Sequence, residues 1–236
     1  MIDKTLPDVA AALADVADGA VVLVGGFGES GSPIELIHGL IDQGARELTV
    51  VSNNTGNGHV GLAALIQAGR VRKMVCSYPR SSHSKVFPDL YRRGEIELEL
   101  VPQGTLAERI RAGGAGVPAF FTPTAAGTVL AEGKEQREFE GRSYVMERAI
   151  RGDVALVRAE AGDRFGNLTF NKAGRNFGPI MCMAAATSVV QVRRILPAGG
   201  IDPEVVVTPG IFVDRLVEVA APAAESELVA QGASYP

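Results

Sequence analysis

Neutral amide side chains stand where two predicted strands end. Asn53 and Asn54 follow the apolar run 48–51, and Gln103 follows the run 96–101. A glycine-rich turn, residues 25–31, follows a third such run at 21–24. Side-chain amides and free backbone N–H groups both donate hydrogen bonds to ligand oxygens. The pattern therefore predicts a site for a carboxylate or for the carbonyl of a thioester.

Each of these features also has another interpretation. Asparagine readily caps its own backbone in a turn, and Gln103 could lie in solvent in the first turn of a helix. The glycines could serve only a tight turn. Gly26-x-Gly28-x-x-Gly31 between a strand and a helix also matches the dinucleotide-binding pattern, although no acidic residue closes the second strand to hold a ribose. The residues alone leave these alternatives open.

A parallel sheet would bring these strand ends together. Predicted strands at 21–24, 48–51, 73–76 and 96–101 alternate with helical stretches at 34–41, 60–68, 84–93 and 105–111. Short connections between alternating elements favour right-handed βαβ units. The sequence predicts an α/β fold, an open and mostly parallel sheet with helices on both faces. Ligands bind such sheets beyond the carboxyl ends of the strands, so one rim could gather all three features.

The helix after the glycine turn carries boundary signals. Ser32 suits the N-cap, Pro33 the first helical position, and Glu35 the closing position of a capping box. Gly44 follows the last apolar residue and suits the C-cap. We expect a capping box at the start of this helix and a glycine cap at its end.

The second half of the chain is less regular. Residues 138–147 predict a hairpin around Gly141, and strands are expected at 153–158, 168–170, 189–192 and 205–207. From residue 220 the chain is rich in alanine and glutamate, and we expect a loosely held tail. We therefore predict one domain, residues 1–219, followed by a tail, residues 220–236.

Composition narrows the class of protein. The 236 residues are 46% apolar and 21% charged, which indicates a folded globular chain. The net charge of −4 argues against general nucleic-acid binding, and no apolar run is long enough for a membrane span. Cys76 and Cys182 lack metal-ligand spacing, so we expect reduced core cysteines, no metal site and a cytoplasmic location. The chain has no self-evident nucleophile.

Longer motifs resemble the A (alpha) chain type of the two-chain family I coenzyme A transferases. The 3-oxoacid and 3-oxoadipate branch is the most similar. The resemblance reaches from the start to about residue 215, and the run 102–116 makes it specific. It rests on residues 18–33 with Val24-Gly25-Gly26-Phe27-Gly28-x-x-Gly31-x-Pro33, and on residues 52–54, 102–116, 166–168 and 173–177.

The resemblance implies a two-step exchange of coenzyme A between carboxylates, with coenzyme A as a substrate and no permanently bound cofactor. A glutamate attacks the donor thioester, here succinyl-CoA. The resulting anhydride yields a glutamyl-CoA thioester, from which a 3-oxo acid takes coenzyme A. That glutamate belongs to the beta subunit, in a Ser-Glu-Asn-Gly motif that this chain lacks. We therefore expect a partner, the beta subunit of the CoA-transferase, in a heterodimer or an α2β2 assembly.

The resemblance also assigns site residues. Gln103 faces the reacting carboxyl, where a preorganised neutral donor would stabilise the negative charge that develops on the thioester carbonyl. Residues 79–88 depart from the family's more glycine- and asparagine-containing, acidic stretch, which would alter acceptor preference if they touch substrate. The alternatives are a dinucleotide-binding oxidoreductase domain and a non-catalytic acyl-CoA-binding protein. The coenzyme A-contacting turn comprises Gly25, Gly26, Phe27, Gly28, Glu29, Ser30 and Gly31, and Asn53, Asn54 and Gly104 line the cleft.

Overall fold

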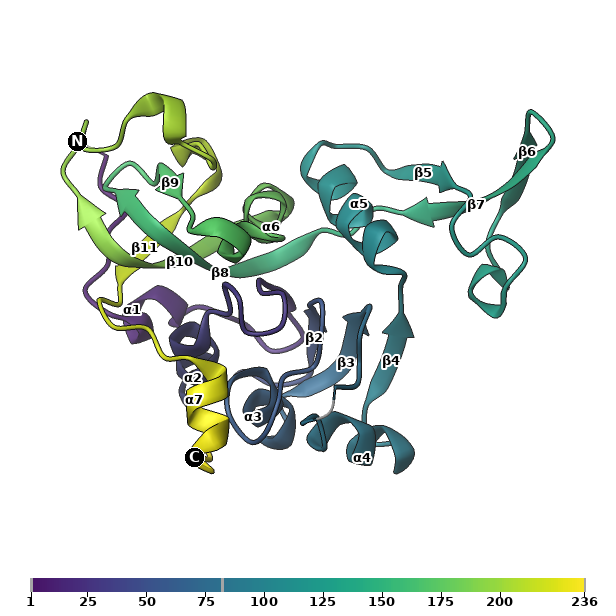
Figure 1. Cartoon of the computed structure of the whole chain (residues 1–236), viewed down its shortest axis with the longest axis horizontal. Helices are drawn as coiled ribbons and strands as arrows, with labels where there is room; N and C mark the ends of the chain where they lie inside the picture. The colour runs from purple at the N-terminus through teal and green to yellow at the C-terminus, as the bar shows by residue number, and fades with distance from the viewer. Residues whose placement is uncertain (1, 82, 236) are drawn as a thin grey trace.

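A computed structural model describes residues 2–81 and 83–235. At its centre is an eight-stranded sheet with the order β11-β10-β8-β1-β2-β3-β4, and β9 pairs with β8 (Figure 1). Every neighbouring pair along this path is parallel, and β9 is antiparallel. The predicted open, mostly parallel sheet is confirmed. Its strands are β1 (Val21–Val24), β2 (Leu48–Val51), β3 (Val71–Cys76), β4 (Glu97–Leu100), β8 (Gly152–Asp163), β9 (Leu168–Thr169), β10 (Ala185–Leu196) and β11 (Arg215–Glu218).

Helices cover both faces of this sheet, so the fold has three layers. Successive residues of β1 face opposite sides of the sheet: Val22 and Val24 lie in one core cluster, and Leu23 lies in the other. A strand covered on both faces has no polar side, which is why these runs lack alternation. The first face carries α1 (Val9–Leu13), α2 (Ile34–Gln43), α3 (Gly61–Gln67) and α4 (Val86–Arg92), and the second carries α5 (Gln103–Gly114) and α6 (Gly178–Ala184).

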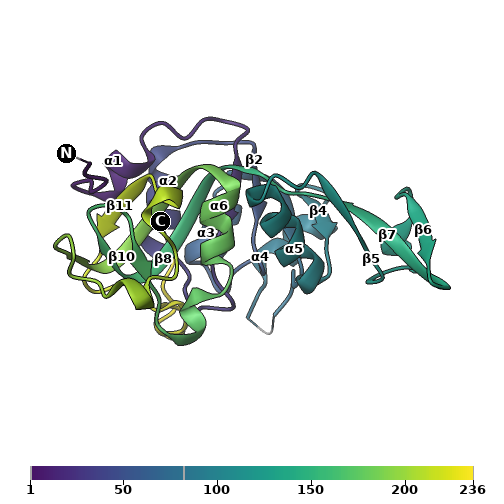
Figure 2. The ribbon, with the colours of Figure 1, turned by 90° about the horizontal axis from the view of Figure 1, so that it is seen from above.

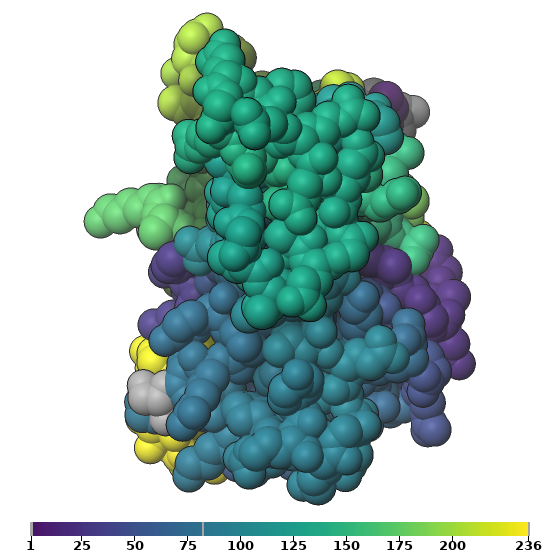
Figure 3. Space-filling model, turned by 90° about the vertical axis from the view of Figure 1, so that its right-hand side faces the viewer, coloured from purple at the N-terminus to yellow at the C-terminus, as the bar shows by residue number. Residues whose placement is uncertain are grey.

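A second, three-stranded antiparallel sheet projects from the body as an arm (Figures 1 and 2). Its order is β5-β7-β6, and the β6–β7 pair confirms the predicted hairpin. In Figure 3, where the arm faces the viewer, it lies above the region of α4 and β4. The arm consists of β5 (Ala119–Thr122), β6 (Gln136–Phe139) and β7 (Arg142–Arg148), with the short 3-10 helix η1 (Val129–Ala131) between β5 and β6.

A buried ionic contact joins the arm to the body. The carboxylate of Glu147 on β7 accepts a 2.6 Å hydrogen bond from Lys134 and lies 3.8 Å from the guanidinium of Arg109 on α5. Arg109 also pairs with Glu99 on β4 at 2.7 Å and donates to the carbonyl of Arg148 at 2.7 Å. Arg109 thus contacts both sheets.

The start of α2 differs from the prediction. Pro33 occupies the N-cap position, without a capping hydrogen bond from a side chain. The carboxylate of Glu35 instead accepts from the side-chain amide of Gln191 and the backbone N–H of Ala223, each at 2.6 Å. The predicted capping box is therefore wrong, because tertiary partners bind Glu35. The predicted cap at Gly44 is confirmed, with φ +99° and an N–H bonded to the carbonyl of Leu40.

The predicted strand at 205–207 is also wrong. Residues Pro203–Val205 form the 3-10 helix η3, and Asp202 caps it by accepting from the N–H of Glu204 at 3.0 Å. Proline lacks an N–H and fixes φ near −65°, which favours a turn here. The following residues contact β9 through a single antiparallel bridge between Thr208 and Leu168. Two further 3-10 helices are η2 (Lys172–Arg175) and η4 (Gly210–Phe212).

The C-terminal residues pack against the body, contrary to the expectation of a loosely held tail. Residues Glu225–Ala230 form α7, and the buried carboxylate of Glu225 accepts a 2.7 Å hydrogen bond from the side chain of Asn57. Tyr235 stacks on His38 with ring centroids 3.7 Å apart and donates to Asp42 at 2.7 Å. All these partners are distant in sequence, so local composition did not indicate them. The division of the chain at residue 219 stays a prediction.

Candidate functional site

The carboxyl ends of β1, β2 and β3 and the start of α5 surround a cavity of about 420 Å³. Its lining is made of amides, hydroxyls, glycines and two aromatic rings. The predicted convergence of the glycine turn, the asparagine loop and the start of the 103–114 helix at one rim is therefore confirmed as geometry. The lining residues are Phe27, Gly28, Asn53, Asn54, Thr55, Gly56, Asn57, Tyr78, Ser81 and Gln103.

Gln103 is the first residue of α5 and is oriented by Asn53. Its Nε2 donates a 2.7 Å hydrogen bond to Oδ1 of Asn53, and the same oxygen accepts from the hydroxyl of Ser77 at 2.8 Å. Asn53 is 4% exposed, so a buried side chain fixes the orientation of the Gln103 amide. A glutamine amide carries two N–H groups and one oxygen. One N–H is used here, which leaves the second N–H and the oxygen for a ligand.

The loop after β2 builds the floor of the cavity. The Oδ1 atom of Asn54 accepts from the N–H of Gly56 at 2.8 Å, a local turn of the kind that asparagine favours. The hydroxyl of Ser81 donates to Oδ1 of Asn57, and that of Thr55 donates to the carbonyl of Pro79 at 2.9 Å. The loop is therefore tied to residues 77–81. Asn54 both shapes the turn and lines the cavity.

The glycine turn is held by Asn176, which stands just before α6. The Oδ1 atom of Asn176 accepts from the N–H of Gly26 at 3.0 Å, and its Nδ2 donates to the carbonyl of Ser30 at 2.9 Å. Gly31, at φ +72°, needs the absence of a side chain, because a Cβ there would lie 2.4 Å from the carbonyl oxygen of Gly174. The turn packs against the η2 segment, which fixes its path.

The predicted coenzyme A-contacting residues do not all face one cavity. Phe27 and Gly28 line the cavity around Gln103, and Phe27 is 50% exposed. Gly25 is bonded through its N–H to the carbonyl of Leu156, which places it against β8. Gly104 is not among the residues that line this cavity.

Glu29 points toward the C-terminal segment. Its carboxylate accepts from the N–H of Ser226 at 2.8 Å. Hydrogen bonds from Ser226 hold the pKa of Glu29 below its usual range, so it is ionised. This contact ties the glycine turn to α7.

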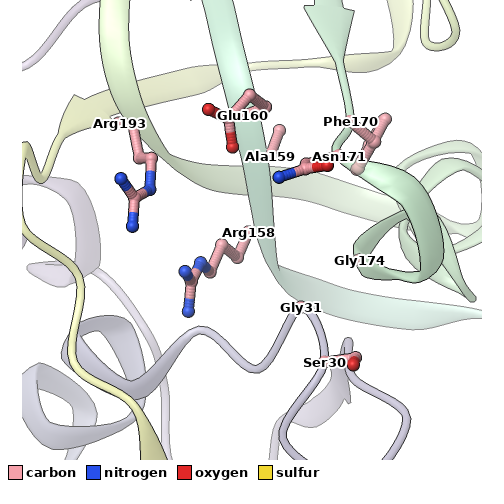
Figure 4. A pocket seen from close by; sticks show the side chains of 9 residues that line it. All are labelled: Ser30, Gly31, Arg158, Ala159, Glu160, Phe170, Asn171, Gly174 and Arg193. Carbon is pink, nitrogen blue, oxygen red and sulfur yellow. The ribbon is translucent and has the colours of Figure 1, made fainter.

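Ser30 and Gly31, the last residues of the glycine turn, line a second hollow of about 300 Å³ (Figure 4). The side chains of Arg158, Glu160 and Arg193 project into it from β8 and β10. The glycine turn therefore contributes to two cavities, the neutral cavity around Gln103 (the amide cavity) and this charged hollow.

Among the described residues, no carboxylate, thiol, lysine or histidine lines the amide cavity. Cys76 and Cys182 are free and buried, and burial raises the pKa of each thiol to about 12. Neither can act as a thiolate nucleophile near neutral pH. Within residues 2–81 and 83–235, no group of His, Cys, Asp or Glu side chains is arranged to hold a metal ion.

Five residues that line the cavity were not predicted as site residues: Thr55, Gly56, Asn57, Tyr78 and Ser81. Tyr78 and Ser81 follow β3 in the way that Asn53 follows β2. The expectation that ligands bind beyond the carboxyl ends of parallel strands could therefore have identified them. Ser81 lies in the stretch 79–88 that departs from the family pattern, and it lines the cavity. Asn57 is held by α7, and no local signal indicated that contact.

The sequence model of the family described as "Coenzyme A transferase" matches residues 7–219. The chain belongs to the coenzyme A transferase family. It is 59% identical over 226 residues to the alpha (A) subunit of the 3-oxoadipate CoA-transferase of Pseudomonas putida, covering 96% of this chain and 98% of that one. It is 46% identical over 215 residues to the corresponding subunit of the succinyl-CoA:3-ketoacid coenzyme A transferase of Helicobacter pylori strain J99, covering 91% and 92%.

Solved structures of coenzyme A transferases share the fold. The apoenzyme of an acyl-CoA transferase from Escherichia coli O157:H7 superposes with a TM-score of 0.85 at 24% identity. The alignment covers 94% of this chain and 48% of that chain, so this chain spans about half of its length. No helix among the described residues has the length and apolar character needed to cross a membrane.

Proposed function

We propose that this chain is the alpha (A) subunit of a 3-oxoacid CoA-transferase. It would move coenzyme A from succinyl-CoA to a 3-oxo acid, either 3-oxoadipate or acetoacetate. The names of the two bacterial relatives support the reaction and the existence of a second, beta (B) subunit. One observation carries the proposal: the rim holds preorganised amide groups around Gln103, and no carboxylate among the described residues lines that cavity.

The beta subunit supplies the missing group in this proposal. One of its glutamate carboxylates attacks the thioester carbonyl carbon, the C–S bond breaks, and coenzyme A leaves as the thiolate. The thiolate then attacks the glutamyl carbonyl of the anhydride and releases the donor acid. The glutamyl-CoA thioester that results passes coenzyme A to the acceptor by the same two steps in reverse.

Gln103 stabilises the oxygen that becomes negative when the carboxylate attacks. Its free N–H is fixed by the hydrogen bond of the other N–H to Asn53, so no reorganisation is needed in the transition state. A neutral amide also avoids binding the ground-state carboxylate too tightly. Phe27 and Tyr78, both exposed aromatic residues, are available to cover the acyl chain or the pantetheine arm.

The decisive experiment purifies the chain with its natural companion and identifies that protein. We expect a companion with a Ser-Glu-Asn-Gly segment, in a heterodimer or an α2β2 assembly. The pair should transfer coenzyme A from succinyl-CoA to a 3-oxo acid, and mass spectrometry should find the thioester on the companion. Full activity of this chain alone would contradict the proposal.

A further inference from the structure

The charged hollow lies at the point where the order of the sheet reverses. From β1 the chain adds β2, β3 and β4 on one side, and later β8, β10 and β11 on the other. Val24, the last residue of β1, pairs with Leu156, whereas β8 continues to Asp163. A crevice therefore opens beyond β1 beside the longer strand. Open α/β sheets bind ligands in the crevice at this reversal.

Two guanidinium groups enter the hollow from rigid strands. Arg158 projects from β8 and Arg193 from β10, and both point into the same space (Figure 4). Arg158 is half-buried, and burial lowers its pKa. Its Nη1 donates one long hydrogen bond, 3.4 Å, to the carbonyl of Ala223. In the described part of the chain, no carboxylate lies within ion-pair distance of either arginine.

The nearby carboxylates act on Arg158 from a distance and form no direct ion pair with it in the described part of the chain. Glu29 and Glu35 interact with Arg158 at longer range, but each accepts hydrogen bonds from the C-terminal segment, from Ser226 and Ala223 respectively. Glu160 lines the hollow as the one acidic side chain there among the described residues, facing two arginines. Arg158 is half-buried and none of these carboxylates forms an ion pair with it, so an anionic ligand in direct contact would offset part of the cost of burying its charge.

The remaining lining suits a small anion. The side chain of Asn171 adds an amide, and Ser30 and Gly31 bring the main chain of the glycine turn against the hollow (Figure 4). A volume of about 300 Å³ accommodates a phosphate or a carboxylate with its immediate neighbours, and is at the lower limit for a whole ligand. Arginine binds both groups through its planar fork of N–H donors.

We propose that this hollow is an anion subsite in which Arg158 and Arg193 bind a phosphate or carboxylate group of a substrate. The inference rests on the proposed function for the identity of that substrate. Two sources carry such a group: the phosphates of coenzyme A, and the distal carboxylate of a dicarboxylic acyl group.

The test uses the assembled enzyme and two neighbouring arginines. Arg193→Ala removes one of the two arginines that bind the anion in this proposal. Arg194→Ala is the matched control, because successive residues of β10 point to opposite faces of the sheet and Arg194 does not line the hollow. Both residues are exposed, so both variants should fold, which thermal unfolding checks. Arg158→Gln is a second variant of the subsite.

Kinetics then distinguish the sources. If the group is a phosphate, Arg193→Ala should raise KM about tenfold for succinyl-CoA, and little for its 3′-dephospho or pantetheine analogue that lacks the bound phosphate. If the group is a carboxylate, the KM for 3-oxoadipate should rise about tenfold while that for acetoacetate stays unchanged. Either result supports the subsite and names its ligand.

Direct titration separates this inference from the proposed function. Pyrophosphate and succinate are titrated calorimetrically into the wild-type pair and both variants. We expect Arg193→Ala to bind at least one of these anions about tenfold more weakly than Arg194→Ala does. Equal KM values and equal anion affinities in the two variants would overturn the subsite. An inactive wild-type pair would contradict the proposed function alone, because the titration does not need turnover.

Discussion

The amide of Gln103 donates a 2.7 Å hydrogen bond to Oδ1 of Asn53, which joins the start of α5 to the end of β2. The two residues are fifty positions apart, and they meet because β2, β3 and β4 are successive parallel strands of one sheet. Asn53 is buried and also receives the hydroxyl of Ser77. The exposed end of Gln103 is thus held by a buried neighbour.

Replacement of Gln103 by alanine should lower kcat of the assembled enzyme about a hundredfold, the usual cost of losing one preorganised donor. Assembly and thermal stability should be unchanged, because Gln103 is exposed at the beginning of its helix. Steady-state kinetics and size-exclusion chromatography check both points. Wild-type kcat in this variant would remove Gln103 from the site.

Replacement of Asn53 by alanine should act through Gln103. Loss of the acceptor frees the Gln103 amide to rotate, so kcat should fall by about tenfold, with less effect on KM. The double variant Asn53→Ala/Gln103→Ala should be little worse than Gln103→Ala alone. Additive losses in this cycle would show that Asn53 acts independently.

Asn176→Ala should loosen the glycine turn. The variant loses the acceptor for the N–H of Gly26 and the donor to the carbonyl of Ser30, and we expect about 2 kcal/mol less stability. The KM for succinyl-CoA should rise as well if the turn contacts coenzyme A. Arg175→Ala, an exposed neighbour, is the control for urea unfolding and kinetics. Unchanged stability relative to this control would contradict the role of Asn176.

Arg109→Ala should destabilise the joint between the arm and the body. The arginine side chain is 12% exposed, and its removal leaves Glu147 buried with Lys134 as its remaining partner. We expect a loss of about 3 kcal/mol, as is usual when one member of a buried ion pair is deleted. Arg111 lies on the same helix, and Arg111→Ala is the control because it breaks only an exposed ion pair with Glu108, worth about 0.5 kcal/mol. Urea unfolding of both variants makes the comparison, and equal losses would rule out a special role for Arg109.

Glu225 should make the attachment of the C-terminal segment depend on pH. Burial raises its pKa above the ordinary 4.5, so in the window just above that value the folded state binds more protons than the unfolded chain. Its contribution to stability is therefore fully present below 4.5 and declines as pH rises through the raised pKa.

Glu225→Gln removes this titration while keeping an oxygen that can accept from Asn57. Stability of the wild type relative to the variant should fall as the pH is raised from 4.5, measured by urea unfolding across the range. Taking the difference cancels the other carboxylates. A difference that is constant with pH would contradict a titrating Glu225.

The sequence by itself determined the layers and the place of the site. Uninterrupted apolar runs such as residues 21–24 favour cover on both faces, and strands that alternate with helices over short connections favour a parallel sheet. The ends of such strands lie at one edge, so the meeting of Asn53, Gln103 and the glycine turn followed from local patterns.

Only the tertiary structure decided which of these residues face a common cavity. Glu35 was available for a capping box, but Gln191 and Ala223 bind it instead. Glu29 accepts a hydrogen bond from Ser226, and the alanine- and glutamate-rich C-terminal segment packs against the body through Glu225 and Tyr235. Such contacts join positions more than a hundred residues apart. They depend on where the chain returns in space, which no local pattern of apolar and polar residues records.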